Sequence, residues 1–230
     1  MPRVVRFYSP LNAYLNESRT LGWLDGASQA YAFSIWVYPT AQSGVIIDEL
    51  PPGGASNDAF LSLVGGNLMV NYLGGAACRS LGAIPLDAWS NVVFTFDGAQ
   101  TITGWVNGVQ TLNPTLNGAR TPPGGAADYV LGGGNPGTNC GTGAYYSGMM
   151  SDYQVYNSAL SNAQVQQLYL NDSVVSMPAN FIMPLSAPHQ GNLNTTQELV
   201  HDNFGIFYVN GVQCTVANAL SGTCIGYVAP

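Results

Sequence analysis

The segment from Ala144 to Asn171 most constrains how this chain can fold, because it predicts a strand, a tight corner and a short helix in direct succession. From Met149 to Tyr156 the residues alternate in character, which is typical of a half-buried strand. The face predicted to hold the odd-numbered residues consists of Met149, Ser151, Tyr153 and Val155. The segment therefore predicts a sheet strand that leads straight into a helix.

The second half of this segment carries the signals of a helix start. Ser161 and Gln164 have the spacing of a capping box, in which each side chain bonds the backbone amide of the other residue. Leu160 and Val165 stand at the two positions of a hydrophobic staple. We expect one short helix near residues 161–170, with an inward face formed by Val165, Leu168 and Tyr169.

The chain before this segment is rich in glycine and predicts many short strands joined by tight turns. Gly65-Gly66, Asp97-Gly98 and Asn107-Gly108 are turn pairs, and both residues of the last pair tolerate the positive φ of a type I′ turn. Residues 112–125 contain several Pro and Gly residues and are expected to form a loop. Many short strands with one terminal helix predict an all-β, two-sheet antiparallel sandwich.

Three further stretches support this interpretation in sequence order. They are Ala32 to Pro39, with Trp36 buried, Ala88 to Gly98, and Trp105 to Gln110. Together with the closing segment they resemble the laminin-G-like jelly rolls of the concanavalin A-like lectin and glucanase superfamily, which also contains the pentraxins. The resemblance implies a jelly-roll domain over residues 1–172, and it leaves function open, because this fold carries sugar binding, adhesion, hydrolysis and assembly.

Residues 173–230 form a C-terminal extension that the family domain does not require. Residues 180–185 resemble the family's first strand, for which the start of the chain has no room. We expect this strand to lie beside residues 149–156, which would make the domain a circular permutation. The alternative is that the extension completes a neighbouring subunit by strand addition. Residues 204–209 predict another strand, which turns at Asn210-Gly211.

The charge of the chain excludes some classes of partner. Charged residues make up only 7% of the sequence, the five basic residues are all Arg, and the net charge is -7. A basic footprint for nucleic acid is therefore missing. No apolar run reaches the roughly 18 residues of a membrane helix, so we expect no membrane insertion, and the N-terminal residues lack the apolar core of a cleavable signal peptide. This low content of charged residues is compatible with a neutral polar surface or with a subunit of a larger assembly.

The four cysteines predict disulfides. Cys214 and Cys224 can close a short loop at low entropy cost, which would leave Cys78 and Cys140 for each other. This connectivity is one of three that four cysteines allow. Disulfides would indicate an oxidising compartment.

The acidic residues argue against catalysis. None of the three glutamates stands two or four residues from another acid on a strand, so paired carboxylates for glycoside hydrolysis are missing. The resemblance implies calcium as a cofactor, with oxygen ligands from Asp48, Asn57, Asp58 and Asp152. Ser151 stands where many relatives have a second acid, and the alternative role of these carboxylates is to cap turns.

Carbohydrate binding would use an aromatic ring as a stacking surface with amide groups beside it. The candidate residues are Tyr72, Trp105, Asn107, Tyr145 and Tyr146. For each ring, packing in the core is the alternative role. We expect a non-enzymatic recognition or adhesion module, extracellular or on a cell or virion surface, that binds a glycan or a surface protein. The alternative is a self-associating structural subunit or decoration protein of a virion, filament or cell-surface layer.

Overall fold

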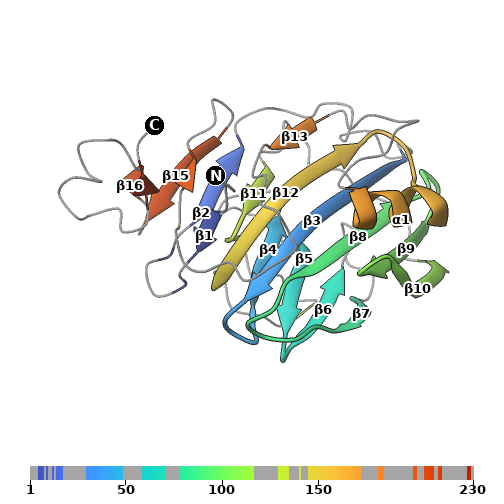
Figure 1. Ribbon diagram of the computed structural model, residues 1–230, viewed down its shortest axis with the longest axis horizontal. Helices are drawn as coiled ribbons and strands as arrows, with labels where there is room; N and C mark the ends of the chain where they lie inside the picture. Colours follow the sequence, from blue (N-terminus) through green and yellow to red (C-terminus); the bar gives the residue numbers. More distant parts are fainter. Residues whose placement is uncertain are drawn as a thin grey trace.

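The computed structural model describes residues 5–7, 9, 12, 14–17, 30–48, 59–70, 78–116, 129–134, 140, 145–171, 181–183, 199–200, 205–209, 212–213 and 227–228. Within these residues the chain forms two large sheets, a two-stranded sheet and one helix, α1 (Asn162–Asn171), which lies over one of the large sheets (Figure 1). The expected all-β sandwich with one short helix is confirmed.

The sheet beneath α1, sheet A, has the strand order β1-β12-β3-β8-β9-β10, and β13 also pairs with β12. Its strands are β1 (Val5–Phe7), β3 (Tyr31–Pro39), β8 (Ser90–Phe96), β9 (Thr101–Val106), β10 (Val109–Leu116), β12 (Gly148–Tyr156) and β13 (Phe181–Met183). All of its pairings are antiparallel.

The opposing sheet, sheet B, has the order β16-β15-β2-β11-β4-β5-β6-β7. Its strands are β2 (Tyr14–Glu17), β4 (Gly44–Asp48), β5 (Ala59–Val64), β6 (Asn67–Val70), β7 (Arg79–Ala83), β11 (Tyr129–Leu131), β15 (Gly205–Val209) and β16 (Val212–Gln213). The two-stranded sheet pairs β14 (Leu199–Val200) with β17 (Tyr227–Val228) in parallel.

The core lies between the two sheets and is rich in aromatic rings. Phe33 of β3 stacks on Phe94 of β8 at 5.1 Å between ring centroids and on Tyr153 of β12 at 5.9 Å. Alternate residues of β3 point the other way, so Ala32 belongs to a second apolar cluster, between sheet A and α1. Sheet A is thus apolar on both faces, because the sandwich covers one and the helix covers part of the other.

The strand and helix predicted between Ala144 and Asn171 are confirmed, but the faces predicted for the strand are wrong. Met150, Tyr153 and Val155 share the core, so the inward positions change from even to odd within β12. The change occurs at a β-bulge between Ser151 and Gln154. Asp152 adopts a φ of 47° there, and the additional residue reverses the alternation of every side chain after it.

The capping box of α1 is confirmed. The Ser161 amide donates to Oε1 of Gln164 at 2.8 Å, and the Gln164 amide donates to Oγ of Ser161 at 3.4 Å. Val165 and Leu168 are buried with Leu160. Tyr169 agrees with the prediction in part: its ring stacks on Trp36 of sheet A at 5.8 Å between centroids, but the residue stays 37% exposed.

The loop expected from residue 112 onward begins later than predicted. Residues up to Leu116 continue β10, which pairs with β9 through two register shifts. Pro114 fits this strand because β10 is the edge of sheet A. Alternate backbone amides of an edge strand point away from the neighbouring strand, so a residue without an amide hydrogen is tolerated there.

Strands from the C-terminal extension join both sheets. β13 pairs with β12 from Tyr153 to Val155, on the edge that β1 occupies from Gly148 to Met150. β1 and β13 therefore lie end to end along one side of β12, although they come from opposite ends of the sequence. β15 pairs with β2 and also with β16. β15 and β16 lie on either side of Asn210-Gly211 in the chain, where a turn was predicted.

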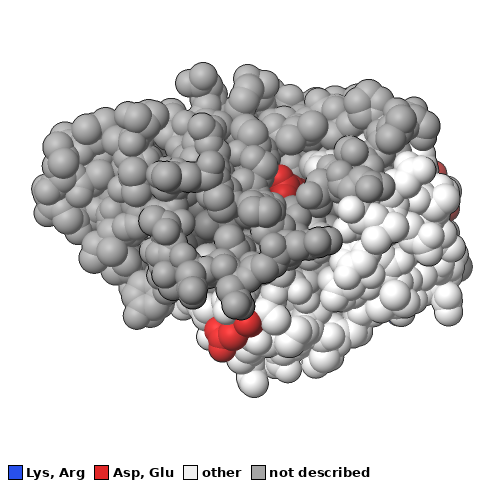
Figure 2. Space-filling model, viewed as in Figure 1, with Lys and Arg blue, Asp and Glu red and all other residues white. Residues whose placement is uncertain are grey.

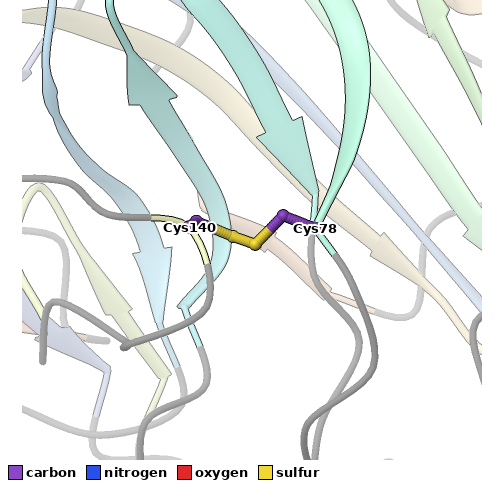
Figure 3. The surroundings of a disulfide bond; sticks show 2 residues. All are labelled: Cys78 and Cys140. Carbon is purple, nitrogen blue, oxygen red and sulfur yellow. A yellow bond between two sulfur atoms is a disulfide. The ribbon is translucent and has the colours of Figure 1, made fainter.

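A disulfide joins Cys78 to Cys140 across 62 residues, with a Cα–Cα distance of 5.5 Å (Figure 3). It ties the residue before β7 to the segment between β11 and β12. Cys214 and Cys224, the other pair expected from the sequence, lie outside the described residues. In the described part of the chain, no helix has the length and apolar character needed to cross a membrane.

Candidate functional site

The two adjacent tyrosines that precede β12 have different environments. Tyr146 is fully buried, its hydroxyl donates to the Met149 carbonyl at 3.4 Å, and its ring meets Phe7 edge-on at 6.2 Å. Burial raises the pKa of Tyr146 well above its usual value. Tyr145 is only half-buried. The ring available to a ligand is therefore that of Tyr145.

Tyr145 lies beside a second half-buried ring, that of Tyr14 in β2. Their ring centroids are 6.5 Å apart and their planes are inclined by 35°. A tyrosine hydroxyl is protonated at neutral pH, and burial raises the pKa of the Tyr145 phenol further. The hydroxyl can therefore both donate and accept a hydrogen bond. Two adjacent phenol rings, one of them at the first residue of β2, form a surface on which a flat ligand can stack.

Gly133 allows the two rings to lie this close. It forms a β-bridge with Tyr145 after the end of β11. A Cβ at this position would lie 2.8 Å from Cβ of Tyr14, too close for real structures, and a tight 3.1 Å from Cδ1 of Tyr145. The next residue, Gly134, lies against the buried carboxylate of Asp48, so a side chain there would displace it.

The segment that carries Tyr14 is fastened to the segment that carries Tyr145. The Ser9 amide donates to Oγ of Ser147 at 2.9 Å, and Oγ of Ser147 lies 2.9 Å from Oγ of Ser9. Asn12, half-buried and at a φ of 48°, donates its amide to the Ser9 carbonyl at 2.9 Å. Asn12, two residues before Tyr14 in the chain, is thus held in a turn that is bonded to Ser9.

The other residues expected at a ligand site have structural contacts. Trp105 is 3% exposed, and its indole nitrogen donates to Oδ1 of Asn162 at 2.7 Å, which fastens the start of α1 to sheet A. Asn107 forms the β9–β10 turn at a φ of 51°, and its Oδ1 accepts the Asn91 amide at 2.8 Å. Tyr72 lies outside the described residues.

The residues expected to bind calcium are divided between the sheets. Asp48 ends β4 in sheet B, and Asp152 forms the bulge of β12 in sheet A, where its Oδ2 accepts the Ser151 hydroxyl at 3.1 Å. Asn57 and Asp58 lie outside the described residues. No group of three or more His, Cys, Asp or Glu residues within the described ranges could hold a metal ion, so calcium stays a prediction.

Sequence reasoning missed Tyr14, which is not among the candidate rings named from the sequence. The signal is the alternation of β2: Leu15 pairs with Leu131, a core residue of β11, so its neighbour Tyr14 belongs to the opposite face. Recognising this requires knowing which strands pair, and that information is not local to the segment.

Two antiparallel sheets packed face to face, with a helix following the closing strand, define a lectin-like jelly-roll sandwich. The family model described as the concanavalin A-like lectin/glucanases superfamily matches residues 15–166, and the chain therefore belongs to this superfamily. No curated protein sequence matches the chain.

Solved structures with the same fold include a heptameric pentraxin from Limulus polyphemus, described as SAP-like, and a putative carbohydrate-binding protein from Bacteroides ovatus. The pentraxin is 20% identical at a TM-score of 0.54, over 73% of this chain and 82% of its own. The Bacteroides protein is 14% identical at a TM-score of 0.58, over 94% of this chain and 62% of its own. At these identities the similarity shows the fold alone.

Proposed function

We propose that this protein is a non-enzymatic carbohydrate-recognition module that acts outside the cytoplasm. The observation that carries the proposal is the pair of half-buried rings, Tyr14 and Tyr145, held side by side over Gly133. The apolar face of a sugar ring can stack on such a surface, while the phenol hydroxyls and Asn12 supply hydrogen bonds to sugar hydroxyls. Ligand sites commonly combine aromatic surface with a few polar groups in this way.

Further support comes from the family and from the disulfide. The superfamily name covers lectins and glucanases, and one similar structure is described as a putative carbohydrate-binding protein. The Cys78–Cys140 disulfide supports an oxidising compartment. Among the residues that the structure describes, the buried aspartates are Asp48 and Asp152, and they belong to different sheets rather than to one strand face, which favours binding over hydrolysis.

A glycan array followed by calorimetry with the best ligand tests this function. Replacing either ring, by Tyr14→Ala or Tyr145→Ala, is expected to weaken binding about tenfold, the order of magnitude of one aromatic contact. Tyr38→Ala is the matched control, because Tyr38 is also half-buried and also contacts another ring, that of Trp89 at 5.6 Å. No glycan binding, or an equal loss in the control, would refute the proposal.

The second candidate function is a structural subunit or decoration protein of a virion, filament or cell-surface layer. Large apolar side chains at the surface favour it: Val109 is 66% exposed and Leu170 is 71% exposed. A subunit of this kind would elute as a large assembly and give no glycan hit, whereas a recognition module requires a defined sugar ligand.

A further inference from the structure

The described face formed by α1 and β10 combines exposed apolar side chains with a lack of charge. The residues that define it, called here the α1–β10 surface, are Val109, Gln110, Asn113, Gln166, Tyr169 and Leu170. Tyr169 links the two elements, because its ring lies against Gly108 in the β9–β10 turn, where a Cβ would be 3.1 Å from Cδ1 of the ring. Val109 follows Gly108 and Leu170 follows Tyr169 in the chain, so an exposed apolar residue adjoins this contact on each element.

The described strands and helix that form this surface carry no charge, although the molecule as a whole is acidic. Residues 101–116 and 153–171 contain no Asp, Glu, Lys or Arg, while the net charge of the chain is -7. Figure 2 shows the surface over α1, β9 and β10, on the right of the view, as white with red only at its rim. Because two copies of an acidic molecule repel each other, the surface that can approach its own copy at least cost is the uncharged one.

The polar groups of this surface are also self-complementary. Gln110, Asn113 and Gln166 carry amide side chains, and an amide both donates and accepts hydrogen bonds. Nε2 of Gln110 donates to Oδ1 of Asn113 at 3.3 Å within the chain, so the groups of these two residues left for a partner copy are the Gln110 oxygen and the Asn113 nitrogen. A carboxylate only accepts and an ammonium only donates, so neither can pair with its own copy. In an interface with two-fold symmetry the same patch meets itself, and amides around an apolar centre satisfy that requirement.

Strand addition at the neighbouring edge is disfavoured. β10 is the edge strand of sheet A, but it contains Pro114 and two register shifts. Proline and bulges at an edge prevent another strand from pairing there. A second molecule would therefore contact the helix and the side chains of β10 rather than extend the sheet.

We propose that the α1–β10 surface binds the same surface of a second copy of this chain, in a symmetric dimer. This dimer does not depend on the carbohydrate site, because Tyr14 belongs to sheet B whereas α1 covers sheet A. It would present two ring pairs per particle, which would raise the avidity for a multivalent glycan.

Sedimentation equilibrium over a range of concentrations tests the dimer. The full chain is expected to show a monomer–dimer equilibrium, and Val109→Glu or Leu170→Glu is expected to raise the dimer dissociation constant at least about tenfold, since each substitution buries like charges in the interface. High salt should partly restore association of these variants by screening, while leaving the wild type little changed.

Gln42→Glu is the matched control, because Gln42 is exposed in the loop between β3 and β4 and the substitution adds the same charge elsewhere. Circular dichroism and the thermal unfolding midpoint establish that each variant is folded. A wild type that stays monomeric would overturn the proposal. So would Glu variants that are folded and associate as the wild type does.

Discussion

At the scale of single residues, one aspartate organises the turn between β8 and β9 in sheet A. Oδ1 of Asp97 accepts the amides of Ala99 at 2.8 Å, Gln100 at 3.1 Å and Thr101 at 3.0 Å, between β8 and β9. Asp97→Ala is expected to lower the free energy of unfolding by about 1–2 kcal/mol, because three amides lose their acceptor at an exposed site. Asp97→Asn keeps the oxygen and should cost less. Urea unfolding of the three proteins measures the difference.

The same carboxylate should make stability depend on acid pH. Burial acts to raise the pKa of Asp97, but the hydrogen bonds from the Thr101, Ala99 and Gln100 amides outweigh it and hold the pKa below the usual value. A lowered pKa means that the stabilisation is present above the pKa of the unfolded chain, about 3.9, and is lost as pH falls through the folded value. Asp97→Asn should flatten the stability profile below pH 4. An unchanged profile would contradict this assignment.

Tyr156 should act at the other end of the pH scale. Its hydroxyl donates to Oε1 of Gln154 at 2.5 Å, and burial raises its pKa to about 12. The unfolded chain releases this proton near pH 10, so stability is fully present below pH 10 and falls as pH rises toward 12. Tyr156→Phe is expected to be less stable at pH 8 but less sensitive between pH 10 and 12, as measured by denaturant midpoints. A parallel decline of both proteins would show that another group titrates.

Residue type alone did not separate binding groups from packing groups. Tyr145 and Tyr146 are neighbours of the same type, yet one is half-buried and the other lies in the core. Trp105 was a reasonable stacking candidate by residue type, but α1 packs over it and Oδ1 of Asn162 accepts its indole hydrogen. Exposure depends on what packs over a strand, and that is decided by segments far away in the sequence.

At the scale of elements, the bulge in β12 sets which side chains face the core. Asp152 occupies the left-handed region, which costs a side-chain residue about 1 kcal/mol and costs glycine nothing. Asp152→Gly is therefore expected to be more stable than Asp152→Ala by about 1 kcal/mol, although both lose the carboxylate. Thermal unfolding of the pair measures the difference. Equal stability would mean that the backbone of β12 is not strained at this position.

Local signals predicted some elements well and others poorly. The helix start at Ser161 was predictable because capping uses residues three apart in the chain. The bulge in β12 was not predictable, because its positive φ is at Asp152, and an aspartate in a strand does not indicate a positive φ as a glycine would. The part of β10 from residue 112 onward was predicted as a loop because proline usually interrupts a strand, and Pro114 is tolerated there because β10 is the edge strand.

At the scale of the whole molecule, the Cys78–Cys140 disulfide closes a loop of 62 residues. Replacing both cysteines by serine is expected to lower the free energy of unfolding by about 4 kcal/mol, from the loop entropy restored to the unfolded chain. Urea unfolding without reductant compares this variant with the wild type. Equal midpoints would show that the crosslink does not constrain the unfolded chain.

The end-to-end placement of β13 and β1 supports our proposal that residues 173–230 form an extension that supplies a permuted first strand to a domain at residues 1–172. Met183 lies opposite Tyr153 and Val5 opposite Met150, so two β12 positions separate the strands. Moving residues 178–185 to precede Val5, with a Gly-Ser segment in their former place, should therefore preserve the fold. The Gly-Ser replacement alone should lower the thermal midpoint. Loss of folding in the first variant would favour strand exchange between subunits.

This placement also affects how the protein is made. A ribosome releases β12 well before β13, and the strand that completes its outer side lies beyond the helix in the chain. At about 5–20 residues per second, the nascent polypeptide spends a few seconds with that side incompletely covered. An unpaired strand edge can pair with another chain, so this interval is when two nascent copies are expected to exchange strands most readily.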